Sequence, residues 1–586
     1  MSEFTYGLFG GLILMACGSE VNESSASHKP PAGPNVLPIE VSFHEAQVPI
    51  LGGTSKGALW RMDLVRTGSI DAFRVERLEL SFEQTPAWTD IRSVALYAAD
   101  SDGGVGTTCL ASGTLTNGTI TFDAGNAVFR DAVGSDQIWL TVALHEKIDI
   151  DHKITARCTN LELTLQSRDE TGVRQMMPFT ADLSPINPPC GARRGVAVRR
   201  SEQDDVCRSR IPGLITTPRG TLLAIFDARH DSSRDLQGDI DIGLHRSIDG
   251  GRTWQPLQII MDLGSWGGLP EKYNGVSDPC ILVDDRSGTI FVAACWMYGI
   301  IDPATGEWVE GLTEESTLWE HQWTKGASLP GWDVKQTAQF VLVRSDDDGI
   351  TWSEPVNLTE QVKPKSHHLF VPAPGRGITM SDGTLIMPTQ GRNAAQTPYA
   401  NILYSEDGGQ SWSSRSSYAY LDGGECTVAE LSDGTLMLNT GRRANIDLAE
   451  GGGNGRGVTV TSNLGRTWTE HPSSCGALIE PPCMASLWRH HYTENGEERS
   501  VLLFFNPAVA GTSVRSDMTL KVSFDDGMTW PEEYWIVIDA KPGSGYSCMT
   551  SVGEEYVGIL FEGSQADLTF VKVSLDDLLK RNLTNP

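Results

Sequence analysis

Carboxylates are the side chains of this sequence best suited to general acid–base chemistry, and several of them recur in one fixed context. That context is an eight-residue pattern, Ser-x-Asp-x-Gly-x-Thr-Trp with minor variation, which appears five times between residues 247 and 530. Asp and Gly together favour a tight turn, because Asp bonds nearby backbone and Gly accepts a positive φ. We therefore predict that the aspartates of this pattern hold hairpin tips and are not catalytic. They are Asp249, Asp347, Asp407 and Asp525.

A second group of carboxylates lies in the segment 227–235, which reads Asp-Ala-Arg-His-Asp-Ser-Ser-Arg-Asp. It offers candidate proton donors beside arginines, whose planar guanidinium groups bind a carboxylate through two hydrogen bonds and stay charged at any working pH. Metal chemistry is not expected, because the sequence contains no CxxC or HxxxH spacing, and no cofactor is expected either.

The elements that must position these residues follow from the repeat. Its closing tryptophans, Trp254, Trp352, Trp412, Trp468 and Trp530, are 98, 60, 56 and 62 residues apart. A unit of about 60 residues that ends each time in a buried aromatic ring is typical of a propeller blade. The longer first interval predicts an unmarked blade or a long insertion.

Composition supports an all-β chain. The sequence has 586 residues, 61 of them Gly, with 39% hydrophobic and 21% charged residues, which suits many short strands joined by turns. Residues 39–185 lack the repeat and alternate like the strands of a β-sandwich. The proline-rich segment 184–189 predicts a linker. Residues 190–586 then form the propeller domain.

The N-terminus resembles an export signal. Residues 8–16 are apolar but too short to span a bilayer, and Leu14 to Cys17 resemble a bacterial lipoprotein cleavage box. We expect a signal segment over 1–17, a flexible tether over 18–38, and a protein exported to the periplasm or cell surface, lipid-anchored at Cys17 or secreted. The ten other cysteines permit disulfides; by proximity, 109 with 158, 190 with 207 and 475 with 483 are plausible.

The net charge of −29 disfavours nucleic acid as a partner. An acidic substrate would therefore need a local basic pocket.

A family resemblance comes from Arg208-Ser-Arg-Ile-Pro-Gly-Leu214 and Gly220-Thr-Leu-Leu-Ala224, followed in order by the turn repeats. This combination over residues 190–586 is similar to the bacterial sialidases. The resemblance implies a six-bladed propeller and an exo-α-sialidase that removes terminal sialic acid from glycans with retention. The sandwich resembles a domain that precedes some of these enzymes and is a candidate carbohydrate-binding module.

The resemblance also implies three arginines that bind the substrate carboxylate. The matching positions are Arg210 in the Arg-Ile-Pro motif, Arg515, and either Arg442 or Arg443, because one extra residue follows the Leu-Asn of that motif. Arg442 is the nearer match. Glu562 matches the glutamate that orients the first arginine.

The implied nucleophile is Tyr546 in Gly-Tyr-Ser, activated by Glu425, with Glu430 as the rival base. A neutral phenol approaches an anionic substrate with less repulsion than a carboxylate. Two residues of one strand five positions apart face opposite sides, so only one of these glutamates can serve.

Asp235, six residues after an arginine, matches the acid/base, and that arginine, Arg229, matches a contact to the 4-hydroxyl of the sugar. Asp278 matches a further substrate-binding carboxylate, Trp296 is a candidate wall for the N-acyl group, and Asp239 is expected to be a solvated loop residue. Two other functions compete with this one. A trans-sialidase would keep every residue named above and differ in acceptor binding, whereas a non-catalytic glycan-binding propeller would not need these residues together.

Overall fold

The structure is a computed structural model that describes residues 39–580 with the exception of 67–69, 124–136, 169–171, 182, 184–189, 234, 236–237, 265–270, 272–273, 299–327, 335 and 450–452. The described chain is all-β. Its helices are single turns: α1 (Thr359–Val362), α2 (Leu575–Leu578) and three 3₁₀ turns at Trp88–Asp90, Arg443–Asp447 and Glu532–Tyr534. None of the described helices is long and apolar enough to cross a membrane. The signal segment, the tether and Cys17 lie outside the described residues.

The first domain consists of two antiparallel sheets that share one apolar core. Alternate residues of each strand point inward, as Met62 and Leu64 do on one sheet and Leu78 and Leu80 on the other, and all four are at most 1% exposed. One sheet contains β1 (Ile39–Glu45), β3 (Gly57–Arg66), β8 (Gln137–Leu144), β5 (Ile91–Ala99) and β6 (Val105–Gly113); the other contains β10 (Arg174–Thr180), β9 (Ile154–Arg168), β4 (Ile70–Ser81) and β7 (Thr119–Asp123), with β11 (Cys190–Ala192) on β9.

The disulfide suggestions were wrong, because no disulfide is formed by Cys109, Cys158, Cys207, Cys475 or Cys483. Cys109 is exposed on β6, whereas Cys158 is buried on β9 of the other sheet.

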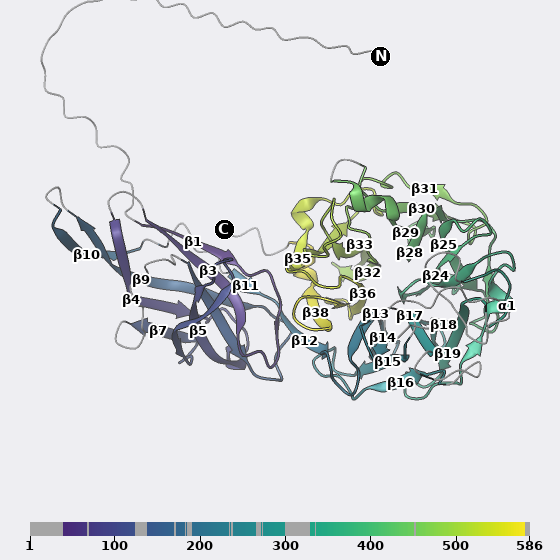
Figure 1. Cartoon of the computed structure of the whole chain (residues 1–586), viewed down its shortest axis with the longest axis horizontal. Helices are drawn as coiled ribbons and strands as arrows, with labels where there is room; N and C mark the ends of the chain where they lie inside the picture. The colour runs from purple at the N-terminus through teal and green to yellow at the C-terminus, as the bar shows by residue number, and fades with distance from the viewer. Residues whose placement is uncertain are drawn as a thin grey trace, which may run out of the picture.

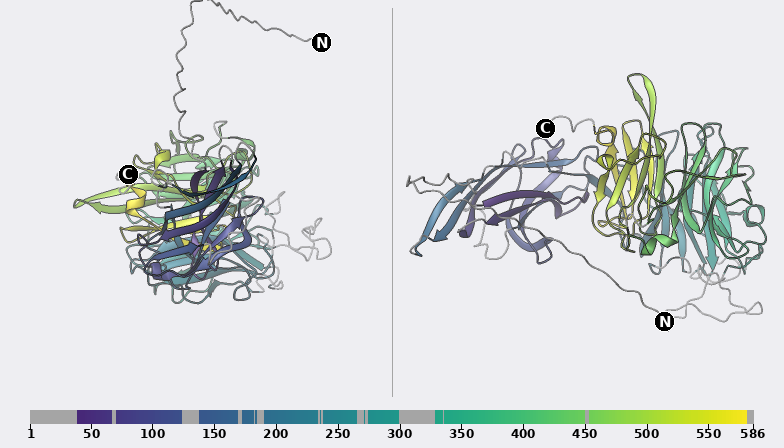
Figure 2. Two further views of the ribbon diagram at one scale, coloured as in Figure 1. Left: turned by 90° about the vertical axis from the view of Figure 1, so that its left-hand side faces the viewer. Right: turned by 90° about the horizontal axis from the view of Figure 1, so that it is seen from above.

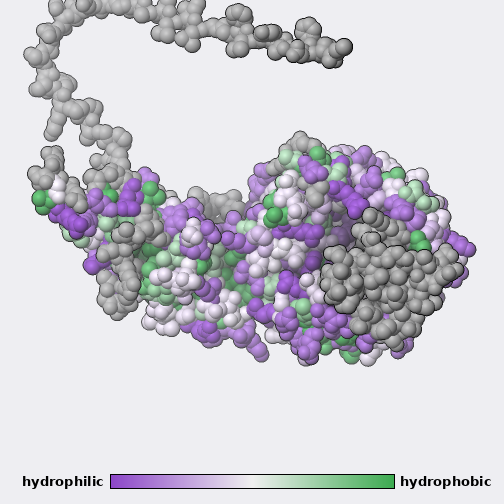
Figure 3. Space-filling view, viewed as in Figure 1, coloured by the Kyte–Doolittle hydropathy of each residue, from purple (hydrophilic) through white to green (hydrophobic). Residues whose placement is uncertain are grey.

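The second domain arranges its sheets around a central axis beside the sandwich (Figure 1), and the two domains together make an elongated molecule (Figure 2). Hydrophilic residues predominate on the visible propeller surface in Figure 3.

The largest propeller sheet has nine strands. Two antiparallel series are joined by the single pair Ile240↔Gly275, and the short strand Gly375–Arg376 pairs parallel with one of them. The number of blades therefore remains a prediction. The strands of this sheet are β13 (Arg208–Thr216), β14 (Leu222–Arg229), β15 (Ile240–Ser247), β16 (Gln258–Met261), β17 (Asn274–Val283), β18 (Ile290–Tyr298), β19 (Gln339–Ser345), β20 (Val356–Asn357) and β22 (Gly375–Arg376).

Three further sheets continue around the axis. The first contains β21 (Leu369–Pro372), β23 (Ile378–Thr379), β24 (Leu385–Arg392), β25 (Pro398–Ser405), β26 (Ser413–Ser414) and β27 (Tyr420–Leu421); the second β28 (Gly423–Glu430), β29 (Leu436–Arg442), β30 (Gly457–Thr461) and β31 (Thr469–Glu470); the third β32 (Ser486–Glu494), β33 (Glu497–Pro507), β34 (Met518–Ser523) and β35 (Ile536–Asp539).

The last sheet closes the ring with strands from both ends of the chain. Its members are β36 (Ser547–Val552), β37 (Tyr556–Phe561), β38 (Leu568–Ser574), β12 (Arg194–Arg199) and β2 (Ile50–Leu51). β12 pairs antiparallel with β38, and β2, which precedes the sandwich strands β3 to β9, pairs parallel with β12. The sandwich is thus tied to the propeller by backbone pairing.

The aspartates of the repeat hold hairpin tips, which confirms their structural role. Asp347 accepts hydrogen bonds from the backbone N–H and hydroxyl of Thr351 at 2.8 and 2.6 Å and from the hydroxyl of Ser345 at 2.9 Å. These bonds lower the pKa of Asp347 to about 2. The closing rings Trp412 and Trp530 are buried against their sheets.

Candidate active site

The site lies where the starts of several inner strands converge on the propeller axis. Arg210 lies at the start of β13, Asp278 in the first half of β17, Glu425 near the start of β28, and Tyr546 immediately before β36. Strands β13, β17, β28 and β36 belong to different sheets or strand series, and β13 contacts both β17 and β36. The fold thereby gathers residues that lie more than 330 positions apart in the sequence.

Tyr546 and Glu425 form a buried pair. The phenol of Tyr546 donates a hydrogen bond to a carboxylate oxygen of Glu425, and Tyr546 is only 8% exposed. Burial, followed by the charge of Glu425, raises the pKa of Tyr546 well above its usual value of 10, and burial also raises the pKa of Glu425. The phenol therefore keeps its proton at rest and has an acceptor in contact for it.

Two arginines flank the tyrosine ring. The guanidinium carbon of Arg515 lies 5.3 Å from the ring centroid of Tyr546, and that of Arg210 lies 5.7 Å away. Arg515 donates to the carbonyl oxygens of Ser544 at 2.8 Å and Pro482 at 3.3 Å. Gly545, at φ +87°, permits this packing, because a Cβ there would lie 2.9 Å from side-chain atoms of Arg515. Both guanidinium groups can thus meet an anion placed over the phenol.

Glu562 fixes the first arginine. One of its oxygens accepts from Nε of Arg210 at 2.6 Å and from the backbone N–H of Ile211 at 2.7 Å. Its other oxygen accepts from the backbone N–H of Tyr546 at 3.1 Å. Burial alone would lower the pKa of Arg210, but the adjacent Glu562 outweighs it and the pKa is raised. Glu562 therefore couples the position of Arg210 to that of Tyr546.

The segment 227–235 supplies a chain of charges at the rim. Arg229 is 1% exposed and pairs with Asp227 at 2.8 Å and with Asp235 at 2.5 Å. The side chain of Asp235 is 65% exposed, so it lies at the mouth, where a leaving group would depart. Asp239 is half-buried rather than solvated. Its carboxyl, the imidazole of His230 and the carboxyl of Asp241 lie within 4.8 Å of one another.

Asp227 belongs to the candidate segment 227–235, but the sequence did not single it out as a site residue. It is fully buried, accepts from the hydroxyl of Ser277 at 2.6 Å and from the backbone N–H of Asp278 at 3.1 Å, and burial raises its pKa to about 6. Asp278 has φ +57°, and burial followed by Glu425 and Asp227 raises its pKa well above its usual range. Asp278 therefore lies close to two other carboxyl groups, those of Glu425 and Asp227.

Arg442 and Arg443 both line a cavity of about 320 Å³ together with Glu425. Nη1 of Arg442 donates to the carbonyl oxygens of Gly453 at 3.0 Å and Gly455 at 3.2 Å, and Arg442 is half-buried. Arg443 is exposed. Arg442 is thus held by hydrogen bonds to backbone and is less exposed than Arg443. Its assignment as the third substrate-binding arginine stays a prediction.

A buried ion pair behind this cavity was also missed. Arg456 pairs with Glu480, both are at most 1% exposed, and Glu480 accepts the backbone N–H of Arg442 at 3.0 Å. Glu480 thereby holds the backbone at Arg442, and no sequence motif marks either residue of the pair.

Two other residues suggested by the sequence lie away from the site. Glu430 ends β28 and accepts from the backbone N–H and hydroxyl of Ser381 at 2.8 and 2.6 Å, so it lies at the far end of the strand from Glu425. Trp296 is fully buried in an apolar core with Ile281 and Val292, and it does not wall the site.

Comparisons with known proteins agree with this geometry. A family model described as a BNR repeat-like domain matches residues 211–532. A sialidase from Bacteroides fragilis is 39% identical over 452 residues, covering 76% of this chain and 74% of that protein. The chain belongs to the sialidase family.

Other members extend the likeness. A sialidase from Paraclostridium sordellii is 27% identical over 392 residues, and the match covers 63% of this chain and 85% of that protein. The solved structure of the Hadza microbial sialidase Hz136 has a TM-score of 0.73 at 31% identity and covers 91% of this chain and 99% of that chain. The match to Hz136 therefore includes the sandwich as well as the propeller.

Proposed function

We propose that this sialidase-family protein is an exo-α-sialidase that hydrolyses terminal sialic acid from glycoproteins and glycolipids with retention through a tyrosyl-enzyme intermediate. The observation that carries this proposal is the hydrogen bond from the phenol of Tyr546 to Glu425, with the guanidinium carbons of Arg210 and Arg515 lying 5.7 and 5.3 Å from the centroid of the phenol ring. That arrangement offers a nucleophile, its base and a clamp for an anion within one site.

The clamp explains why a phenol suits this reaction. Sialic acid has a carboxylate on its anomeric carbon, and Arg210, Arg515 and Arg442 would hold that carboxylate through charge-assisted hydrogen bonds. A carboxylate nucleophile would approach against the substrate's own charge, whereas the phenol is neutral until Glu425 accepts its proton. Glu425 is positioned for this transfer, because the two groups are already hydrogen-bonded.

In the first step the oxygen of Tyr546 forms a bond to the anomeric carbon while the bond to the leaving oxygen breaks. Glu425 takes the phenolic proton and Asp235 gives its proton to the leaving oxygen. In the second step Asp235 accepts a proton from water, the water oxygen replaces Tyr546 on the anomeric carbon, and Glu425 returns the proton to the phenol. The exposure of Asp235 suits both exchanges.

The proposal is tested by release of 4-methylumbelliferone from its α-sialoside by the purified full chain. The account expects steady turnover with free sialic acid as product, also when lactose is present as an acceptor. Sialyllactose as the main product would indicate a trans-sialidase instead. No turnover by correctly folded protein, with binding of sialylated glycans retained, would indicate a non-catalytic propeller.

We also propose that the protein is exported and lipid-anchored at Cys17. The apolar segment 8–16 directly before Cys17 supports this. Wild-type protein expressed in a bacterial host with radiolabelled palmitate should incorporate label, and Cys17→Ser should not; equal labelling of both would contradict it.

A further inference from the structure

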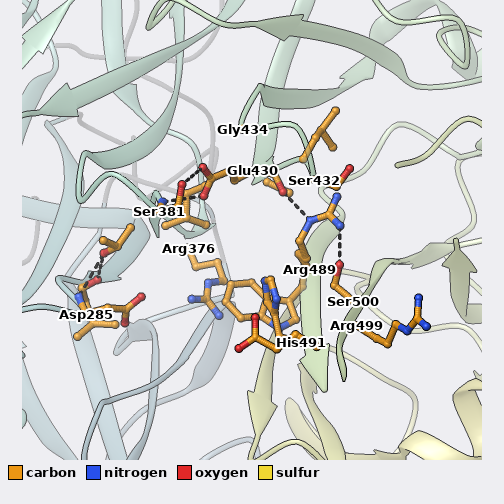
Figure 4. A pocket seen from close by; sticks show the side chains of 17 residues that line it. Asp285, Arg376, Ser381, Glu430, Ser432, Gly434, Arg489, His491, Arg499 and Ser500 are labelled. Carbon is orange, nitrogen blue, oxygen red and sulfur yellow. Dashed lines mark hydrogen bonds between the residues drawn. The ribbon is translucent and has the colours of Figure 1, made fainter. Parts of the chain in front are cut away.

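A second cavity lies at the opposite mouth of the propeller axis. It has a volume of about 540 Å³, within the range of ordinary small-molecule sites, and is lined by the far ends of the inner strands, including Val283 of β17 and Glu430 of β28 (Figure 4). Glu430 is five residues from Glu425 along β28, which places the two about 16 Å apart at the rise of an extended strand. This cavity is therefore distinct from the candidate active site.

Arg376 is its most unusual lining residue. The arginine is 7% exposed, its Nε donates to the carbonyl of Gly377 at 3.2 Å, and its Nη1 donates to the carbonyl of Met549 at 3.0 Å. Its guanidinium stacks on the ring of Trp488, 3.7 Å from the centroid. Among the described residues no carboxylate lies within ion-pair distance of Arg376 and its Nη2 has no hydrogen-bond partner, although Nη2 would ordinarily seek one.

Two other charged residues of the cavity are already engaged. Arg489 pairs with Asp526 and donates to the hydroxyl of Ser500 at 2.9 Å, and Glu430 is satisfied by Ser381. Asp285 is exposed, and none of the described residues bonds its carboxylate. Figure 4 shows Arg376 between Asp285 and Arg489. The buried positive charge of Arg376 thus lacks a direct counter-ion.

We propose that this cavity binds a sugar-sized molecule with a carboxylate group, held by Arg376 and oriented by surrounding hydroxyls. Its carboxylate would accept from Nη2 and would supply the counter-ion that the described residues do not. The hydroxyls of Ser381, Ser432 and Ser500 line the same cavity beside the indole of Trp488, a mixture that suits the polar and apolar faces of a saccharide. The ligand class is therefore a sugar acid rather than a neutral sugar or an inorganic ion.

The test uses the full chain with Arg515→Ala, which removes a clamp residue of the other mouth, and titrates it with N-acetylneuraminate by isothermal calorimetry. Neutral N-acetylglucosamine is the control ligand. We expect N-acetylneuraminate alone to bind, and we expect added Arg376→Met to weaken binding by about 10-fold or more, because a charge-assisted bond is lost.

Asp285→Asn gives a second, oppositely directed readout. It removes a negative charge near the ligand without removing a side-chain contact among the described residues, so N-acetylneuraminate should bind about 2-fold or more tighter. This variant decides the matter if Arg376→Met fails to fold. Arg344→Met, at an exposed arginine that pairs with Asp346 and is not part of the cavity lining, is the matched control and should leave the affinity unchanged.

Absence of binding, equal binding of the neutral sugar, or binding that responds to neither Arg376→Met nor Asp285→Asn would overturn the proposal. The outcome is separate from that of the proposed function, which is measured as hydrolysis by the wild-type chain. A protein without sialidase activity could still bind at Arg376, and an active sialidase could fail to.

Discussion

The hydroxyl of Tyr546 and the carboxylate of Glu425 are buried together, and each alters the ionisation of the other. Burial is the larger cause of the raised pKa of both groups, and the negative charge of Glu425 adds to it for Tyr546. Tyr546 is thus kept neutral, and in the proposed mechanism proton transfer accompanies attack. The positive charges of Arg515 and Arg210 would then stabilise the phenolate as it develops.

Tyr546→Phe should lower kcat by roughly 10³-fold or more while the protein stays folded, because the nucleophile is lost and the buried ring is kept. The measurement is hydrolysis of a 4-methylumbelliferyl α-sialoside. Tyr534→Phe, at a tyrosine that packs on Phe524 outside the site, is the control and should retain full activity. A variant at Tyr546 with near wild-type kcat would remove this residue from the mechanism.

The pH dependence follows from Glu425. This carboxyl must be ionised to accept the phenolic proton, and burial raises its pKa above the ordinary value of 4.5. Activity should therefore be lost as the pH falls through that raised pKa, so the acid limb of kcat/KM should have its midpoint above 4.5. A profile that stays flat below pH 4.5 would contradict the assignment of Glu425 as base.

The two candidate arginines can be separated by kinetics. Arg442→Ala should raise KM for the sialoside by about 10-fold or more, because a half-buried charge-assisted contact is lost. Arg443→Ala, at the exposed neighbour, should change KM by less than about 2-fold. The reverse ranking would assign the third arginine to Arg443.

At the scale of elements, the hairpin repeats should contribute to stability and not to chemistry. Asp407 accepts from the backbone N–H and hydroxyl of Ser411 and from the hydroxyl of Ser405, and these bonds lower its pKa to about 2. Asp407→Ala should destabilise the protein by roughly 1–2 kcal/mol by denaturant unfolding, with kcat unchanged. Glu406→Ala, at the exposed neighbour, is the control; equal losses in both variants would refute the role of Asp407.

Sequence motifs predicted residues that the structure brings together at this site, because Arg210, Tyr546 and Glu425 lie in recognisable strings. They did not predict Asp227 or the pair Arg456 and Glu480, which act through burial and backbone contacts that no spacing encodes. Alternation predicted the sandwich strands, whereas it could not say that β2 leaves them to pair with β12. Long-range pairing depends on how the whole chain closes, and local pattern does not contain that information.

At the scale of the whole molecule, ion pairs reinforce the junction between the domains. Arg194 of β12 is 1% exposed and pairs with Asp90 of the sandwich at 2.9 Å. Asp577 after β38 pairs with Arg193 at 2.8 Å and with Lys153 of the sandwich at 3.0 Å. The sandwich is therefore a rigid neighbour of the ring closure rather than a loosely tethered module.

Arg194→Met should lower the melting temperature by several degrees in calorimetry, because Asp90 and nearby carbonyl groups lose a buried partner worth about 3 kcal/mol. Arg200→Met, at an exposed arginine just after β12, is the control and should melt like wild type. A melting temperature unchanged by Arg194→Met would show that the ion pair of Arg194 with Asp90 does not stabilise the junction.

The covalent intermediate gives the most direct test of the central claim. The full chain is incubated with 2,3-difluorosialic acid, digested with protease and analysed by mass spectrometry. We expect one fluorosialyl group on the peptide that contains Tyr546, because the fluoride on the anomeric carbon leaves when the bond to Tyr546 forms. A label on another residue, or an active enzyme that carries no label under these conditions, would contradict attack by Tyr546.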